Sequence, residues 1–233
     1  MKHPGTMGFQ PEVSFGIPQA DVMPLSGTYC PIIFFDIAAF GDSKRDNDVQ
    51  ISVRNGLYQI LARSFDHLKI RQSLYYRQDC GDGVLMIFPP TLSTETLAFL
   101  PAWLAVEIQR HNKCASPAAQ IQLRAALHVG PVHWDAHGVC GQALIHAARL
   151  IEAQPPRDAL AAAGADLVFI VSESVYDMVI QHTPHPAGTP YRQIRARVKE
   201  SAITAWITLS VTQYDLNPPG HHRHRLSAVP GLP

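Results

Sequence analysis

Two aspartates lie at positions where the surrounding apolar sequence gives no packing reason for a charge. Asp36 ends the apolar run PIIFFD, and Asp82 lies in the Gly-Asp-Gly turn of CGDGVLMIF. Two carboxylates brought together repel each other unless a cation neutralises them. Hard divalent cations such as Mg²⁺ bind one or two carboxylates together with substrate phosphates. Two such ions stabilise the attacking and the leaving oxygen of a phosphoryl transfer, so the pair points to that chemistry.

The alternative is that each aspartate acts only locally, because Asp-Gly is a common turn dipeptide. For Asp82 alone, this alternative is at least as good as a metal site. The two residues together favour the metal site if the fold brings them to one edge of a sheet.

The apolar pattern predicts a fold that does this. Helical spacing and strand-like runs alternate along the chain, with Gly and Pro between them. The predicted elements are a strand at 32–36, a helix from Asp48 to Phe65, strands at 68–76 and 84–88, a helix at 94–111, strands at 121–129 and 132–134 joined by a Gly130-Pro131 turn, a helix at 142–153, a strand at 167–171, a helix capped by Ser172 that runs to Gln181, and strands at 191–198 and 202–209.

The order β-α-β-β-α-β is that of a ferredoxin-like split βαβ fold, here with a C-terminal α/β extension, so the predicted class is α+β. In this fold the first strand and the central hairpin are neighbours, which brings Asp36 and Asp82 together. We expect an irregular arm at 1–29, a folded domain at 30–213 and a flexible Pro/His-rich tail at 214–233.

Composition excludes several classes of function. The chain has 233 residues, 46% of them hydrophobic, and a formal net charge of zero, which suits one globular domain. A neutral chain is a poor general binder of nucleic acid or anionic membrane. No apolar run reaches the roughly 18 residues of a membrane span, and no signal peptide is visible. The four cysteines form no CxxC pair. We therefore expect a cytoplasmic protein with no nucleic-acid or membrane partner.

Three segments, in order, carry a family resemblance. PIIFFDIAAFG resembles the first metal-binding strand of the class III nucleotidyl cyclases, and DCGDGVLMIFPP resembles their second metal segment. LRAALHVGPVHWDAHGVCGQALIHAARLIEA is similar to their third segment, a strand followed by a glycine and a helix with Ala-x-Arg-Leu. The resemblance covers about residues 31–209. It extends to stand-alone cyclases of actinobacterial type and to the pyrimidine cyclases of Pycsar anti-phage systems.

The resemblance implies that the chain is a metal-dependent cyclase and that residues 30–213 are its catalytic domain. Asp36, Asp82 and the carbonyl of Ile37 match the ligands of two divalent metal ions, Mg²⁺ or Mn²⁺. Arg149 matches the arginine that stabilises charge at the α-phosphate, and Lys199 matches a lysine at the terminal phosphates. Without the resemblance, both would be ordinary surface cations. The substrate would be a ribonucleoside triphosphate, and the active sites would lie at the interface of a homodimer.

The base-selecting positions of the family correspond to Gln78 and Gly138 here. Adenylate cyclases carry Lys and Asp at these positions, and guanylate cyclases carry Glu and Cys, so this chain matches neither. A glutamine amide both donates and accepts, so it could pair with uracil, with cytosine or with neither uniquely. The departure from both purine patterns favours a pyrimidine nucleotide, UTP or CTP. The Pycsar resemblance then implies cUMP or cCMP as an antiviral signal for a separate effector activated by the cyclic nucleotide.

One departure leaves a second hypothesis open. The family places Asn four residues before the arginine, where it orients the ribose, and this chain has Ile145 there. The neighbouring His146 is the candidate replacement, although a shift of one residue turns a helical side chain by about 100°. The alternatives to a pyrimidine cyclase are a catalytically degenerate module that binds nucleotide or a partner, and an adenylate or guanylate cyclase.

Overall fold

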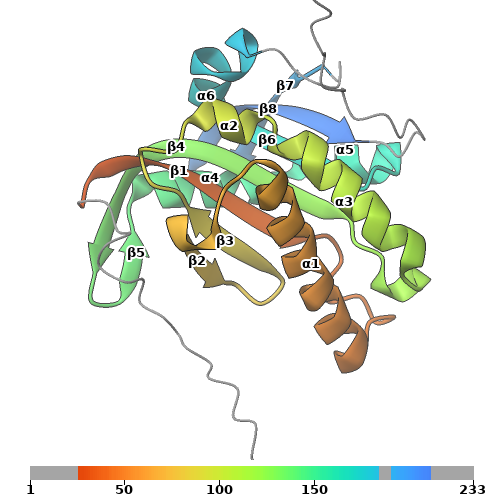
Figure 1. Cartoon of the computed structure of the whole chain (residues 1–233). Coiled ribbons are helices and arrows are strands. Elements are labelled where there is room, and N and C mark those ends of the chain that lie inside the picture. Colours follow the sequence, from red (N-terminus) through yellow and green to blue (C-terminus); the bar gives the residue numbers. More distant parts are fainter. Residues whose placement is uncertain (1–25, 184–189, 211–233) are drawn as a thin grey trace, which may run out of the picture.

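The computed structural model describes residues 26–183 and 190–210 of the chain. Within these ranges it forms an eight-stranded sheet with helices on both faces (Figure 1). In chain order the helices and strands are β1 (Thr28–Ile37), α1 (Asn47–His67), β2 (Tyr76–Asp79), β3 (Gly83–Ile87), α2 (Thr94–Ala98), α3 (Leu100–Cys114), β4 (Leu123–Asp135), β5 (Gly138–Cys140), α4 (Gln142–Glu152), α5 (Gln154–Ala163), β6 (Leu167–Ser172), α6 (Glu173–Met178), β7 (Arg192–Val198) and β8 (Ser201–Ser210).

The sheet has the strand order β2-β3-β1-β4-β6-β8-β7, and β5 pairs with β4 outside this path. β1 lies between β3 and β4 and is antiparallel to both. β4 and β6 are parallel, as expected for strands joined by helices, and the other pairs are antiparallel. The predicted class is confirmed: β1, α1, β2, β3, the helix pair α2–α3 and β4 follow the split βαβ order, and the elements from β5 to β8 form the extension.

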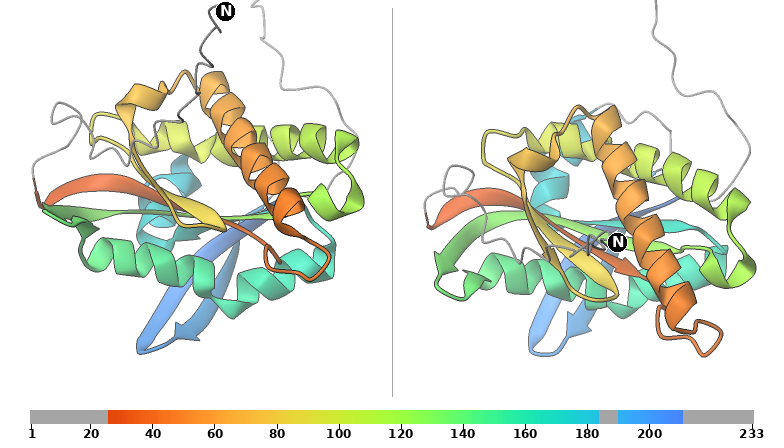
Figure 2. Two further views of the ribbon diagram at one scale, coloured as in Figure 1. Left: turned by 90° about the horizontal axis from the view of Figure 1, so that it is seen from below. Right: turned by 60° about the horizontal axis from the view of Figure 1, so that its bottom comes forward.

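Helices cover both faces of the sheet (Figure 2), and strand parity decides which side chains each face receives. Ile33, Phe35 and Ile37 of β1 are buried in the core that includes residues of α1 and α3. Phe34 packs against the two smaller clusters on the other face, which include residues of α4 and α5. Because successive side chains of a strand alternate, Asp36 belongs to the face covered by α4 and α5.

Two predicted segments were wrong in the first half of the chain. Segment 68–76 is not a strand, because Lys69 adopts a left-handed backbone with φ of 60° and a short 3-10 turn precedes β2. The single helix predicted at 94–111 is two helices that meet at Phe99. Pro101 lies in the first turn of α3, where no intrahelical N–H is needed, so it starts a helix instead of straining one.

Two further expectations fail at the ends of strands. Gly130 and Pro131 do not form a turn, because β4 continues through them beside β1. β6 pairs with β4 only as far as Leu127, so at Pro131 strand β4 has no β6 neighbour. A strand that is bordered on one side only tolerates a residue without a backbone N–H donor. The helix after Ser172 ends at Met178, followed by a 3-10 turn, and the Ser172 hydroxyl bonds Ser174 and His128 instead of capping it.

Helix α5 and the short strand β5 were not predicted from the sequence. The predicted tail at 214–233 lies outside the described residues, as does most of the predicted arm at 1–29. The last residues of that arm are described, and β1 begins there at Thr28. None of the helices in the described ranges combines the length and hydropathy that a bilayer crossing requires.

Replacing Gly83 by alanine tests how tightly the β2–β3 hairpin is pressed onto β1. A Cβ at this position would overlap the carbonyl oxygen of Phe35, which belongs to the backbone and cannot rotate away. We expect Gly83→Ala to lower the free energy of unfolding by at least about 2 kcal/mol in urea titrations. Gly41→Ala is the control, because a Cβ there meets no atom within 4 Å; a similar loss in both variants would contradict the close approach.

Candidate functional site

Backbone pairing holds Asp36 and Asp82 next to each other. Asp36 is the register partner of Gly83, which directly follows Asp82. The N–H of Ile37 donates a hydrogen bond to the Asp82 carbonyl oxygen at 3.0 Å. The missing side chain of Gly83 is what permits this approach. The two aspartates are thus fixed by main-chain contacts that do not involve their carboxylates.

Arg124 of β4 is a site residue that the sequence analysis missed. It is the register partner of Asp36, and its Nε donates to Oδ2 of Asp36 at 2.5 Å. Burial raises the pKa of the Asp36 carboxyl, Arg124 opposes this shift, and the nearby negative charge of Asp82 adds to it. Asp36 therefore lies in a partly buried position where an added positive charge is favourable. Arg124 was hard to find from the sequence because only the register aligns it with Asp36.

The donor atoms fit a hard divalent cation. In the part of the chain that the structure describes, no three or more His, Cys, Asp or Glu side chains gather into a metal cluster. A structural zinc site, which takes four Cys or His ligands, is therefore not formed by these residues. Two aspartates with backbone carbonyls, water and phosphate oxygens are the set that Mg²⁺ and Mn²⁺ use, since Mg²⁺ keeps few protein ligands.

Asp79 does not join the pair. It lies on the other face of the hairpin, where Arg54 of α1 forms an ion pair with it at 2.6 Å and the Tyr58 hydroxyl donates to it. Burial alone would raise the pKa of Asp79, but the bonds from Tyr58, the Gly81 N–H and Arg54 together lower it. Strand alternation explains the position, because Gln78 and Asp79 face opposite sides.

The two positions that the family resemblance assigns to base selection lie close together in the structure. Gln78 on β2 accepts a hydrogen bond from the Tyr76 hydroxyl at 3.1 Å. A Cβ added to Gly138 of β5 would lie 4.0 Å from the same hydroxyl. Tyr76 is held edge-on against Trp134 of β4, with ring centroids 5.1 Å apart, and burial raises the pKa of its phenol. Tyr76 thus joins Gln78 and Gly138, although the sequence pattern gave it no role.

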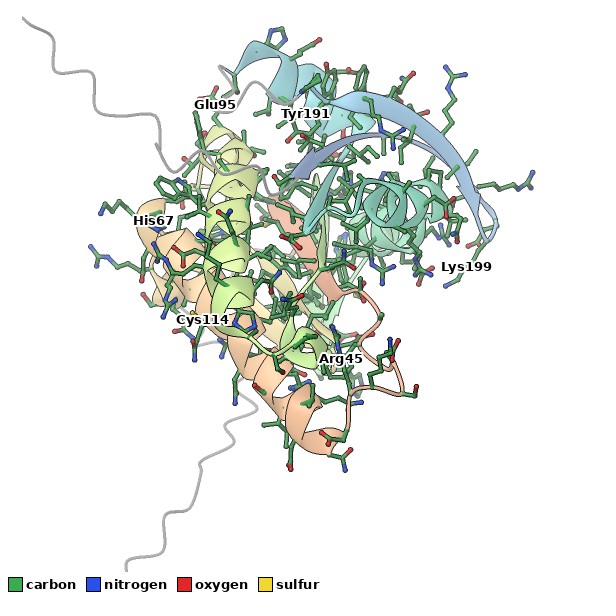
Figure 3. The ribbon with its side chains drawn as sticks, turned by 90° about the vertical axis from the view of Figure 1, so that its right-hand side faces the viewer. Arg45, His67, Glu95, Cys114, Tyr191 and Lys199 are labelled. Atoms are coloured by element: carbon green, nitrogen blue, oxygen red, sulfur yellow. The ribbon has the colours of Figure 1, made fainter. Side chains whose placement is uncertain are left out.

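Arg149 and Lys199 both have partners where α4 meets the turn between β7 and β8, and Figure 3 shows Lys199 at that turn. The Arg149 guanidinium on α4 donates to the Ser201 hydroxyl at 2.5 Å and forms an ion pair with Glu200. The ammonium of Lys199 lies 3.2 Å from the Glu152 carboxylate at the end of α4. Both cations predicted to bind phosphate therefore have partners at the contact between α4 and this turn.

Ile145 and His146 point in different directions from α4. The Ile145 side chain is 41% exposed, and it cannot form a hydrogen bond. His146 turns inward, with its ring 4.6 Å from the ring of His128 on β4. Burial lowers the pKa of His146, and the positive charge of Arg149 lowers it further. His146 therefore does not occupy the position that Ile145 leaves without a polar group.

The two histidines line a pocket of about 560 Å³ between α4, β4, β6 and β8. Nδ1 of His128 lies 2.9 Å from the Ser172 hydroxyl, which in turn contacts the Ser174 hydroxyl. Burial lowers the pKa of His128 to about 4, so its ring is neutral at pH 7. This pocket adjoins α4 on the side of Arg149, and Asp36 lies at the far end of β1 from it.

Comparison with solved structures identifies this architecture. The chain is similar to the guanylyl cyclase Cya2, with a TM-score of 0.57 and 12% identity over 84% of this chain and 100% of that one. The fold is that of the class III nucleotidyl cyclases. An adenylate/guanylate cyclase/hydrolase from Silicibacter pomeroyi matches with a TM-score of 0.56 and 17% identity, over 80% of this chain and 98% of that one.

A third class III cyclase structure is the guanylate cyclase domain of RhGC from Catenaria anguillulae in complex with GTP. It matches with a TM-score of 0.53 and 18% identity, over 79% of this chain and 97% of that one. No family model matches the sequence, and no curated protein matches it at a significant level. The likeness is thus one of fold, carried by few identical residues.

The buried histidine predicts how stability depends on pH. The folded-state pKa of His128 lies near 4, below its ordinary value of 6.5, so the unfolded chain takes up a proton first as the pH falls. The contribution of the neutral His128 ring to the free energy of unfolding is therefore complete above pH 6.5 and is lost as the pH falls toward 4. We expect about 2 kcal/mol of loss between about pH 7 and pH 4.5 in urea titrations.

His128→Gln should flatten this part of the pH profile, whereas His137→Gln, at an exposed turn residue, should leave it unchanged. An equally steep profile for His128→Gln would show that other groups cause the loss.

Proposed function

We propose that this chain is a metal-dependent nucleotide cyclase. It converts a ribonucleoside triphosphate to the 3′,5′-cyclic monophosphate and pyrophosphate. The observation that carries this proposal is the fixed juxtaposition of Asp36 and Asp82 at the end of β1, in a class III cyclase fold. No packing requirement explains two acids at that place, whereas phosphoryl transfer with divalent metals does.

Asp36, Asp82 and the carbonyl of Ile37 are the groups that would hold two divalent ions, Mg²⁺ or Mn²⁺. When bound, such ions supply Lewis-acid stabilisation of the 3′-oxygen and the phosphate oxygens. Arg124 donates a hydrogen bond to Asp36, so it orients this carboxylate. When no divalent ion is bound, it also limits the repulsion between Asp36 and Asp82.

The cations of the chain account for the rest of the chemistry. Arg149 presents a planar fork that suits the oxygens at the α-phosphate, and Lys199 would contact the terminal phosphates. Because phosphoryl transfer needs little covalent participation from the protein, positioning and charge stabilisation are the main contributions of these residues. The 3′-oxygen attacks the α-phosphate, and pyrophosphate leaves with its electron pair.

The proposed assembly is a homodimer with active sites at the interface, where one subunit holds the metal ligands and the other contacts the base and phosphates. The exposed apolar side chain of Ile145 on α4 supports it, since a second copy would remove that side chain from water.

For the base we propose a pyrimidine, UTP or CTP. The Tyr76 hydroxyl donates to Oε1 of Gln78, so the Gln78 amide is left to present its NH₂ group as a donor. Gly138 adds no side chain that would complement a purine. A cUMP or cCMP product would fit a Pycsar-type role, in which the cyclic nucleotide activates a separate antiviral effector in the cytoplasm.

A second candidate function rests on Ile145. If the ribose needs a polar group at this position, neither Ile145 nor the inward-turned His146 provides one. The chain would then be a degenerate cyclase-fold module that binds a nucleotide or a partner without turnover. The aspartate pair argues against this, because a module without metal chemistry has no use for the repulsion between the two acids.

Removal of either metal-binding carboxylate tests the proposed function. We expect wild-type protein with Mn²⁺ or Mg²⁺ to convert one of ATP, GTP, CTP and UTP to a cyclic monophosphate, detected by chromatography and mass. Asp36→Asn and Asp82→Asn should each lower turnover at least about a hundredfold, because charge stabilisation is lost. Asp79→Asn is the matched control and should keep most of the activity, since Asp79 faces α1. A folded wild-type protein that is silent with all four nucleotides would favour the degenerate module.

Tyr76→Phe tests the assignment of the base pocket. Without the phenol O–H, the Gln78 amide is free to rotate, and the discrimination between UTP and CTP should fall about threefold to tenfold, the value of one hydrogen bond. The measurement is kcat/KM for each nucleotide in the variant and the wild type. Tyr75→Phe is the control, because this ring packs against Phe65 and Phe88 in the other core. Unchanged discrimination in Tyr76→Phe would remove Tyr76 from the pocket.

A further inference from the structure

The two cations proposed to bind phosphate already have acidic partners within the chain. The guanidinium of Arg149 is bonded by the Glu200 carboxylate and the Ser201 hydroxyl. The ammonium of Lys199 is paired with Glu152. A polyphosphate that binds here must therefore replace carboxylate oxygens as well as water.

The β7–β8 turn fixes this arrangement. Val198 pairs with Ser201, so the turn consists of only Lys199 and Glu200. Lys199 has a φ of 53°, in the left-handed region that favours glycine. Such a backbone persists in a non-glycine residue only where its surroundings hold it, and it is frequent at functional sites. The two-residue hairpin itself requires a positive φ, and the contacts of Lys199 with Glu152 and of Glu200 with Arg149 attach the turn to α4.

The members of the Arg149 pair differ in exposure. The Arg149 side chain is only 15% exposed, whereas that of Glu200 is 72% exposed. The guanidinium is therefore held from behind by the protein, and the carboxylate covers it from the solvent side. A carboxylate and a phosphate offer the same charged oxygens to the arginine fork. Glu200 thus occupies the place from which a phosphate would approach Arg149.

We propose that Glu200 is a positioning residue that stands in for a substrate phosphate. It holds the Arg149 guanidinium in place in the free protein and is displaced when a polyphosphate binds. This inference rests on the proposed function, since it takes Arg149 as the phosphate-binding group. Because exposed ion pairs are weak, the polyphosphate can displace Glu200 at a modest loss of affinity, about threefold.

The test is the affinity for inorganic triphosphate, measured by titration calorimetry on the full chain in metal-free buffer at low ionic strength. Glu200→Gln should bind triphosphate about threefold more tightly than wild type, because a neutral amide competes less well for Arg149. Glu200→Ala is a second variant that removes the competing oxygen altogether and should bind at least as tightly. Glu95→Gln, at an exposed acid in the first turn of α2, removes the same charge elsewhere and should bind like wild type.

The variant Arg149→Ala distinguishes a failure of the stand-in role of Glu200 from a failure of the proposed function. If Arg149→Ala loses triphosphate binding while both Glu200 variants bind no more tightly than wild type, the stand-in role is wrong and the proposed function remains. If Arg149→Ala binds triphosphate as well as wild type does, Arg149 is not the phosphate site, and the stand-in role falls together with that part of the proposed function. A gain shared by Glu95→Gln would show a general charge effect and would also overturn the stand-in role.

Discussion

The repulsion between two carboxylates that the backbone holds together is the constraint on which the rest of the site depends. The pairing of β1 with β3 aligns Asp36 with Gly83, and the hydrogen bond from Ile37 to the Asp82 carbonyl fixes the hairpin tip. Neither aspartate can move away without breaking sheet contacts. The fold therefore maintains a concentration of negative charge, and Arg124 compensates only part of it.

Strand parity decides which residues share a face with that charge. Asp36 and Arg124 are register partners on the face covered by α4 and α5, and Gln78 lies on the same face of β2. α4 packs on this face and carries Arg149 toward the β7–β8 turn. Asp79 has the opposite parity and is neutralised by α1 instead. A shift of one residue in β1 would turn Asp36 to the opposite face, which α1 and α3 cover.

Much of the fold could be predicted from periodicity, because β1, α1, β3, α4 and β6 are long or strongly patterned elements. The secondary-structure predictions failed where local sequence signals are ambiguous. Pro101 begins α3 instead of lying within one long helix, and Gly130-Pro131 continues β4, because a proline or glycine is compatible with several structures. The tertiary environment, and not the local sequence, chose among them.

The candidate site shows the same limit. Asp36 and Asp82 could be identified from the sequence because acids directly beside apolar strands are unusual. Arg124 and Tyr76 could not, because their roles follow from register and from contacts between strands distant in sequence. The partners of Arg149 are likewise set by a turn that is distant in sequence, since Glu200 lies 51 positions after Arg149. Such pairings are properties of the folded chain.

The proposed function depends on a divalent cation site formed by Asp36 and Asp82. The most direct test of this site is binding of Mn²⁺ to the full chain, followed by the electron paramagnetic resonance signal of free Mn²⁺. We expect saturable binding to the wild type, loss of that binding in Asp82→Asn, and wild-type binding in Asp79→Asn. Absence of binding to a folded wild type, or equal binding by Asp82→Asn, would contradict it.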